Sequence, residues 1–173
     1  MNHDTYDNSY IAGILNSVKT IAMVGASPND VRPSYFVLKY LLAKGFSVVP
    51  INPGHAGKQI LGQTVYASLD GLPHPVDMVD VFRASAAVPG IIDQALKLDP
   101  LPKVVWMQLG VRDDEAAARA EAAGIKVVMN RCPKIEYGKL SGEIGWTGVN
   151  SGVLSSKKPL MRQGFQSFGV RQK

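Results

Sequence analysis

The chain has one cysteine, Cys132, and no uninterrupted apolar segment of the ~20 residues that a membrane-spanning helix needs. A single cysteine excludes an intramolecular disulfide, and a lone thiol is typical of proteins from a reducing compartment. The first residues, MNHDTYDN, are polar and acidic and lack the apolar core of a secretory signal. We therefore expect a cytoplasmic protein that does not bind membranes.

Histidine and recognisable catalytic groups are also scarce. The only histidines are His3, His55 and His74, and none has the spacing of a metal-binding motif, so we predict no metal site. No set of catalytic residues is evident. Cys132 is expected to be a small buried apolar residue, with a redox or mixed-disulfide role as the less favoured alternative. The sequence therefore favours a binding module and leaves open whether the protein is an enzyme.

Excess positive charge is absent from most of the chain. The net charge is +5, but five basic residues and one acidic residue lie from residue 141 onward, whereas residues 1–140 carry 14 basic and 13 acidic residues. The charge excess belongs to the C-terminal segment and does not argue for a nucleic-acid partner. Residues 141–173, rich in glycine, serine and basic residues, are expected to form a flexible tail behind one domain over residues 1–140.

Strand-like and helix-like patterns alternate over residues 1–140. Apolar runs predict five buried strands, at residues 21–24, 46–51, 78–82, 103–109 and 126–129. Helical periodicity predicts a leading helix over about 7–18 and further helices over 34–44, 86–98, 113–123 and 131–140. Such alternation is the signature of a parallel sheet with right-handed crossovers. We predict a Rossmann-like α/β three-layer sandwich with a five-stranded parallel sheet in the order 3-2-1-4-5.

The residues around the end of the first strand form the most specific local pattern. In TIAMVGAS, residues 20–27, apolar residues run into Gly25, and a helical pattern begins after Pro33. A strand, a tight turn and a helix N-terminus together suit a phosphate group. The dinucleotide fingerprint G-x-G-x-x-G is, however, reduced to Gly25. Ile51-Asn52-Pro53 stands where an NAD-binding protein usually has an acidic residue, so ordinary NAD binding is disfavoured.

Ligands of open parallel sheets bind beyond the carboxyl ends of the strands. The residues at the five predicted ends are Gly25-Ala26-Ser27, Asn52-Pro53, Phe82-Arg83, Gln108-Leu109-Gly110 and Asn130-Arg131-Cys132-Pro133. Most of these ends carry a side chain that can hydrogen-bond a ligand, and two carry an arginine. The set predicts a site for an anionic, partly polar ligand.

Seven short motifs occur in an order that resembles a known family. They are VGAS, RPSY, VVPINP, ILG, VDMVDVFR, VVWMQLG and VVMNRCPKIE, and the resemblance covers roughly residues 15–140. In this order they are similar to the small CoA-binding domain proteins, which are free-standing relatives of the CoA-binding domain of the succinyl-CoA synthetase alpha subunit. The resemblance implies a Rossmann-like fold that binds coenzyme A or an acyl-CoA across the strand ends.

The resemblance also implies roles for individual residues. Gly25-Ala26-Ser27 would let the backbone approach the pyrophosphate, and Ser27 would add a hydroxyl. Arg32 would pair with a phosphate, and Lys58 with the 3′-phosphate. Asn52-Pro53 would lie beside the adenosine half. The remaining implied contacts line the path of the adenine or the pantetheine, and they are Val81, Phe82, Arg83, Gln108, Leu109 and Gly110.

Three functions stay open at this point. The favoured one is binding of CoA or acyl-CoA without catalysis. The first alternative is a non-catalytic subunit or a partner-dependent enzyme of acyl-CoA metabolism, because none of the three histidines lies in a motif resembling the phosphorylated histidine of full-length synthetases of this kind. The second is a sensor of a nucleotide or NAD(P). A homodimer or a metabolic-enzyme partner also stays open.

Overall fold

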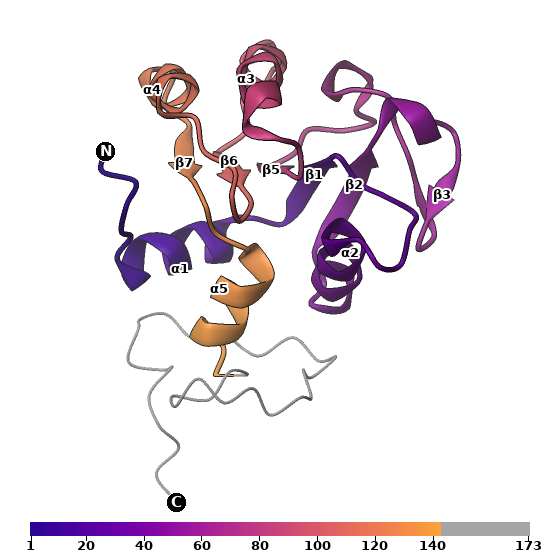
Figure 1. The fold of residues 1–173 in the computed structure, drawn as a ribbon, viewed down its shortest axis with the longest axis horizontal. Coiled ribbons are helices and arrows are strands. Elements are labelled where there is room, and N and C mark those ends of the chain that lie inside the picture. Colours follow the sequence, from indigo (N-terminus) through magenta and orange to yellow (C-terminus); the bar gives the residue numbers. More distant parts are fainter. Residues whose placement is uncertain (143–173) are drawn as a thin grey trace, which may run out of the picture.

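Five parallel strands form the centre of the structure, a computed structural model that describes residues 1–142. They are β1 (Thr20–Val24), β2 (Ser47–Ile51), β5 (Met78–Val81), β6 (Val104–Met107) and β7 (Lys126–Val128). Their order across the sheet is β2-β1-β5-β6-β7 (Figure 1). Every predicted strand is present, within two residues of its expected bounds. The predicted tail lies, from residue 143 onward, outside the described residues.

Helices cover both faces of this sheet. One face carries α1 (Asn8–Ser17), α2 (Pro33–Ala43) and α5 (Pro133–Leu140), and the other carries α3 (Val88–Ala95) and α4 (Asp114–Ala122) (Figure 1). The predicted three-layer sandwich and its leading helix are confirmed. Within residues 1–142, no helix is long and apolar enough to cross a membrane.

The helix that follows β5 is shorter than its periodicity predicts. Residues Ser85–Ala87 form a separate 3-10 turn, η3, and α3 begins only at Val88. Pro89 lies in the first turn of α3, a position where the missing amide hydrogen costs nothing. The start of α3 is therefore fixed at the carboxyl edge of the sheet.

The edge of the sheet beside β2 contains structure that the sequence pattern misses. After the 3-10 turn η1 (Pro53–His55) comes a short hairpin of β3 (Gln59–Ile60) and β4 (Gln63–Thr64), whose two-residue strands give no periodic signal. Tyr66 then makes a parallel bridge to Ile51. A second 3-10 turn, η2 (Leu69–Gly71), follows.

The Tyr66 bridge also explains the strand order. When the Tyr66 bridge is counted as the third strand in chain order, it takes the outer place beside β2. The order Tyr66-β2-β1-β5-β6 then corresponds to the predicted 3-2-1-4-5 layout. The strand at Met78–Val81 is the third of the five longer strands. It does not take the outer place beside β2 but pairs directly with β1. The chain thus changes its winding direction between β1 and β5.

The core is split into two layers by the sheet. Side chains that alternate along the strands point to opposite faces, so Met23, Met78 and Trp106 pack towards α1, α2 and α5, whereas Val79 and Met107 pack towards α3 and α4. All of these side chains are buried. Apolar packing on both faces explains why the strands read as continuous apolar runs.

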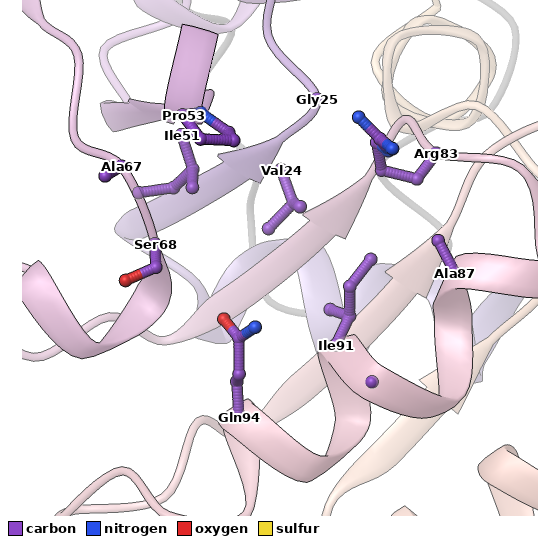
Figure 2. Close-up of a pocket in the computed structure, with 11 residues that line it drawn as sticks. Val24, Gly25, Ile51, Pro53, Ala67, Ser68, Arg83, Ala87, Ile91 and Gln94 are labelled. Carbon is purple, nitrogen blue, oxygen red and sulfur yellow. The ribbon is translucent and has the colours of Figure 1, made fainter. Parts of the chain in front are cut away.

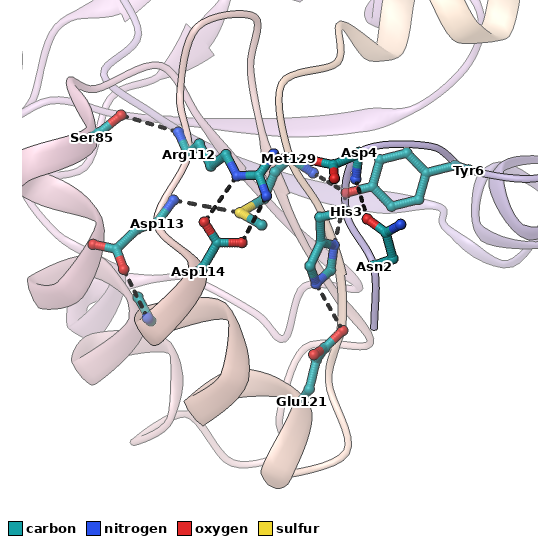
Figure 3. Close-up of polar contacts among 11 residues, drawn as sticks. Asn2, His3, Asp4, Tyr6, Ser85, Arg112, Asp113, Asp114, Glu121 and Met129 are labelled. Atoms are coloured by element: carbon teal, nitrogen blue, oxygen red, sulfur yellow. Dashed lines mark hydrogen bonds and ion pairs between the residues drawn. The ribbon is translucent and has the colours of Figure 1, made fainter.

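The residues before α1 lie against the β7 side of the carboxyl edge. The Tyr6 hydroxyl accepts a hydrogen bond from the Met129 amide at 2.8 Å, and His3 contacts both the Tyr6 hydroxyl and Glu121 of α4 (Figure 3). Asp4 forms an ion pair with Arg112. The N-terminal segment is thus tied to residues that follow β6 and β7.

Candidate functional site

A pocket of about 260 Å³ opens at the carboxyl edge, where the winding direction changes between β1 and β5. Strand ends, the loops after β2 and the first turns of α3 surround it (Figure 2). The lining residues are Val24, Gly25, Ile51, Pro53, Ala67, Ser68, Arg83, Ala87, Gly90, Ile91 and Gln94. Most of them are apolar, and polar side chains come from Ser68, Arg83 and Gln94. Ligands of open α/β sheets bind at such a place.

Gly25 holds the turn after β1 against the end of β5. Its φ of +90° lies in the left-handed region, and a Cβ added to it would lie 2.8 Å from the Phe82 carbonyl oxygen. Only glycine fits this turn without strain. The amides of Gly25 and Ala26 both donate to the Ile51 carbonyl, at 2.9 and 3.3 Å. Because these amides are engaged within the protein, a phosphate at this turn needs other donors.

Asn52 joins the turns that follow β1 and β2. Its Nδ2 donates to the Ala26 carbonyl at 2.8 Å, and its Oδ1 accepts from the Gly54 amide at 2.9 Å. Both polar atoms of this side chain are therefore used to hold loops in place. The contacts position Pro53, the next residue in the chain, in the wall of the pocket. Asn52 acts here as a positioning residue, and its contact with an adenosine stays a prediction.

Three cationic side chains at this edge make no ion pair with any residue in the described range 1–142. Arg83 lines the pocket, and its Cδ lies beside the turn at Gly25. Arg32 and Lys58 are exposed on the loops after β1 and β2, outside the pocket lining. Unpaired positive charge next to a concave apolar surface favours an anionic ligand with an apolar portion.

The end of β6 has a different chemical character. Gln108 is buried, and its Nε2 donates to Oδ1 of Asp80 at 2.7 Å. Burial raises the pKa of Asp80 to about 7, although the hydrogen bond from Gln108 opposes the shift. Leu109 is 59% exposed, and the Gly110 amide donates to Asn130 Oδ1 at 2.8 Å. This part of the edge therefore offers an amide and an apolar surface.

Cys132 lies just before α5 and is buried, as the sequence predicts. Burial raises the pKa of its thiol, so the protonated form dominates at neutral pH. Among residues 1–142, no three His, Cys, Asp or Glu side chains are grouped closely enough to hold a metal ion.

The structure brings three of the predicted site residues together in the pocket, namely Gly25, Pro53 and Arg83. Ala26 and Val81 are fully buried, so their side chains do not reach the surface. The other predicted residues do not line the pocket and follow the carboxyl ends of β1, β2, β5 and β6, and they are Ser27, Arg32, Asn52, Lys58, Phe82, Gln108, Leu109 and Gly110. Their contacts with a ligand stay predictions.

The strand-end rule does not identify the pocket residues that come from other elements. These are Ala67 and Ser68, which precede η2, and Ala87, Gly90, Ile91 and Gln94, which belong to η3 and α3. A usable signal does exist, since a crossover helix that follows a parallel strand starts at the same edge as the strand ends. The small residues Ala87 and Gly90 at that start leave room for a ligand.

Comparisons with known proteins extend this picture. A model of the CoA binding domain family matches residues 19–138. The chain is 34% identical over 127 residues to the uncharacterized protein YneT of Bacillus subtilis, covering 73% of this chain and 91% of that protein. A solved structure of a hypothetical protein from Pyrococcus horikoshii OT3 is 36% identical and superposes with a TM-score of 0.74, over 81% of this chain and 96% of that one.

A larger protein also matches. The chain is 26% identical over 147 residues to the ADP-forming acetate–CoA ligase I of Archaeoglobus fulgidus, covering 80% of this chain but 21% of that enzyme. The family match, residues 19–138, includes all five strands of the main sheet and every predicted site residue. The chain therefore belongs to the CoA binding domain family.

Proposed function

We propose that the protein binds coenzyme A or an acyl-CoA along the carboxyl edge of its sheet, without chemistry of its own. The observation that carries this proposal is the pocket at the winding change, with Arg83 in its lining and no carboxylate of residues 1–142 paired to that side chain. Membership of the CoA binding domain family supports the choice of ligand.

The pocket fits the adenine end of such a ligand. Val24, Ile51 and Ile91 offer apolar contacts to a flat base, while Ser68 and Gln94 supply hydrogen-bonding groups. A volume of about 260 Å³ holds a base and part of a ribose, and the rest of the ligand extends along the edge.

The phosphates would be held by side chains more than by the first turn. Because the Gly25 and Ala26 amides already bond to Ile51, the guanidinium groups of Arg83 and Arg32 are the better donors. We expect Lys58, exposed on the loop after β2, to contact the phosphate on the ribose. The uncharged arm of the ligand then runs towards β6, where Leu109 is exposed.

A second function is favoured by one specific finding. One relative with a named activity is an ADP-forming acetate–CoA ligase, of which this chain corresponds to about a fifth. A partner-dependent role in acyl-CoA metabolism is therefore the alternative to pure binding. An NAD(P) sensor is less favoured, because Asn52 replaces the usual acidic residue and its side chain is occupied.

Calorimetric titration of the purified chain with CoA, acetyl-CoA, NAD and ATP tests the proposal. We expect CoA to bind more tightly than NAD or ATP. We expect Arg83→Gln to weaken CoA binding roughly tenfold or more, since a hydrogen bond to a charged group contributes ~1.5–3 kcal/mol. Lys97→Gln, which removes an exposed charge just beyond the other end of α3, is the matched control and should bind CoA normally.

Two results would count against this reading. Absence of CoA binding, or tighter binding of NAD, contradicts the choice of ligand. Formation of an acyl-CoA by the isolated chain from ATP, CoA and a carboxylic acid contradicts the absence of catalysis and supports an enzymatic function instead.

A further inference from the structure

A carboxyl group lies inside the sheet with only half of its hydrogen-bonding capacity used. Asp80 is the third residue of β5, between Met23 of β1 and Trp106 of β6, and its exposed fraction is 0%. Its Oδ1 accepts from Gln108 Nε2 at 2.7 Å. Its Oδ2 is buried and has no hydrogen-bond partner among the described residues.

This arrangement is costly for the fold. A buried polar atom without a partner destabilises the folded state, and burial of the charge raises the pKa of the carboxyl group to about 7. The flanking side chains of the same layer, Met23 and Trp106, show that an apolar residue would suit the position. A polar residue at such a place calls for a role outside packing.

The contact with Gln108 supplies that role. Above its pKa of about 7 the Asp80 carboxylate can only accept, so Gln108 turns its amide nitrogen towards Asp80. This fixes the orientation of the amide group and leaves Oε1 as the free end, to which no residue of the described range donates. Gln108 retains 5% of its surface exposed while Asp80 retains none, so a ligand can meet the pair only through Gln108.

Gln108 lies at the same carboxyl edge as the pocket, but its side chain meets Asp80 in the layer of α1, α2 and α5. A ligand in the pocket, which is lined by side chains of the α3 layer, therefore reaches Gln108 by crossing the strand ends. The backbone amide of Gln108 donates to the Val81 carbonyl, and the backbone amide of Phe82 donates to the Val24 carbonyl. Phe82 is therefore the neighbour of both Gln108 and the turn at Gly25. At a strand spacing of ~4.8 Å, Gln108 stands roughly 10 Å along the edge from that turn. The distance exceeds the reach of a base in the pocket but not that of an extended arm.

We propose that Asp80 is a positioning residue, which holds Gln108 so that its carbonyl oxygen accepts a hydrogen bond from an amide N–H of the ligand's uncharged arm. This inference rests on the proposed binding of CoA, whose pantetheine arm carries secondary amides. An acceptor at this place selects for N–H groups and disfavours phosphate oxygens, which are acceptors themselves. By orienting Gln108, Asp80 thus makes the end of β6 bind the uncharged arm of the ligand and not its phosphates.

The test compares CoA with adenosine 3′,5′-bisphosphate, which lacks the arm, by calorimetric titration at pH 8, above the pKa of Asp80. Gln108→Leu and Asp80→Leu should each weaken CoA binding roughly five- to tenfold, the effect of one neutral hydrogen bond, and leave the bisphosphate unchanged. Asp80→Asn can donate as well as accept, so it no longer fixes the Gln108 amide in one orientation. With both orientations equally populated, CoA binding should weaken by about twofold. The double variant Asp80→Leu with Gln108→Leu should bind CoA no more weakly than Gln108→Leu alone.

A second measurement needs no variant at Asp80 to fold. In the NMR spectrum of the wild-type protein, the side-chain amide resonances of Gln108 should shift on addition of CoA and stay in place on addition of the bisphosphate. Unshifted resonances at saturating CoA overturn the contact. Equal losses of affinity for both ligands in the variants, or full CoA affinity in a folded Asp80→Leu, overturn the positioning role. If the wild type binds neither ligand, the proposed function itself fails, which separates the two failures.

Discussion

Arginine side chains at two parts of the same sheet edge differ in whether they form ion pairs. On the β7 side, Arg112 donates two hydrogen bonds of 2.9 Å to the Asp114 carboxylate and one of 2.6 Å to Asp4 (Figure 3). Arg83 lines the pocket (Figure 2). It pairs with no carboxylate of residues 1–142. The same residue type therefore closes the fold in one region and stays available to an anion in the other.

The neighbours of the two arginines follow the same division. On the β7 side, His3 lies 2.8 Å from the Tyr6 hydroxyl and 3.2 Å from Glu121, so its ring has partners on both nitrogens. In the middle of β5, the strand whose end precedes Arg83, Asp80 keeps a buried oxygen that has no hydrogen-bond partner among residues 1–142. Polar groups that are satisfied internally report how the chain is held together, and those left unsatisfied indicate where it acts.

The largest expected effect concerns the turn at Gly25. Gly25→Val should destabilise the whole protein by about 3–6 kcal/mol, because a Cβ at φ +90° meets the Phe82 carbonyl oxygen at 2.8 Å. Urea unfolding followed by circular dichroism measures this. A loss of this size would show that the backbone beside the pocket stabilises the fold as much as the β7 side does, although the charged groups beside the pocket do not stabilise it.

Gly13→Ala in α1 is the matched control, because nothing lies within 4 Å of a Cβ at that position. It should stabilise the protein by up to about 1 kcal/mol, as expected in a helix. A stable, well-folded Gly25→Val variant would contradict the geometry of the turn, and would restore the simpler expectation that this glycine serves ligand approach alone.

A smaller effect concerns Asp80 and has a defined dependence on pH. Since burial raises the pKa of this carboxyl group from 3.8 to about 7, the folded protein holds a proton between pH 4 and 7 that the unfolded chain releases. Asp80 therefore makes the protein less stable as pH rises through that range, with no further loss above it. At pH 8, Asp80→Asn should be more stable than the wild type by about 2–4 kcal/mol.

Urea unfolding of both proteins from pH 4 to 8 gives the difference curve directly. Asp30→Asn, which changes an exposed carboxylate that makes no ion pair among residues 1–142, serves as the control. If the free energy of unfolding changed with pH in the same way in the wild type and in Asp80→Asn, the Asp80 carboxyl group would not be what destabilises the protein at high pH.

The sequence predicts which residues lie at this edge better than it predicts their hydrogen-bond partners. Apolar runs and helical periods locate all five strands, and the strand-end rule then selects Gly25, Pro53 and Arg83, which do line the pocket. Hydrogen-bond partners are beyond such rules. Nothing in the sequence shows that the Gly25 amide bonds to Ile51, or that Gln108 turns inward, because both depend on the spacing between strands that only the fold fixes.

The smallest expected effect on stability is that of substituting Arg112, and the matching substitution of Arg83 separates the two parts of the edge. Arg112→Gln removes exposed ion pairs, which contribute little, so we expect a slightly lower melting temperature and unchanged affinity for CoA. Arg83→Gln should show the reverse, with unchanged melting temperature and weakened CoA binding. Differential scanning calorimetry and titration of the two variants side by side measure both quantities. If Arg112→Gln lost as much CoA affinity as Arg83→Gln, the ligand would extend across β6 to the β7 side, and the division of the edge into a binding part and a fastening part would be wrong.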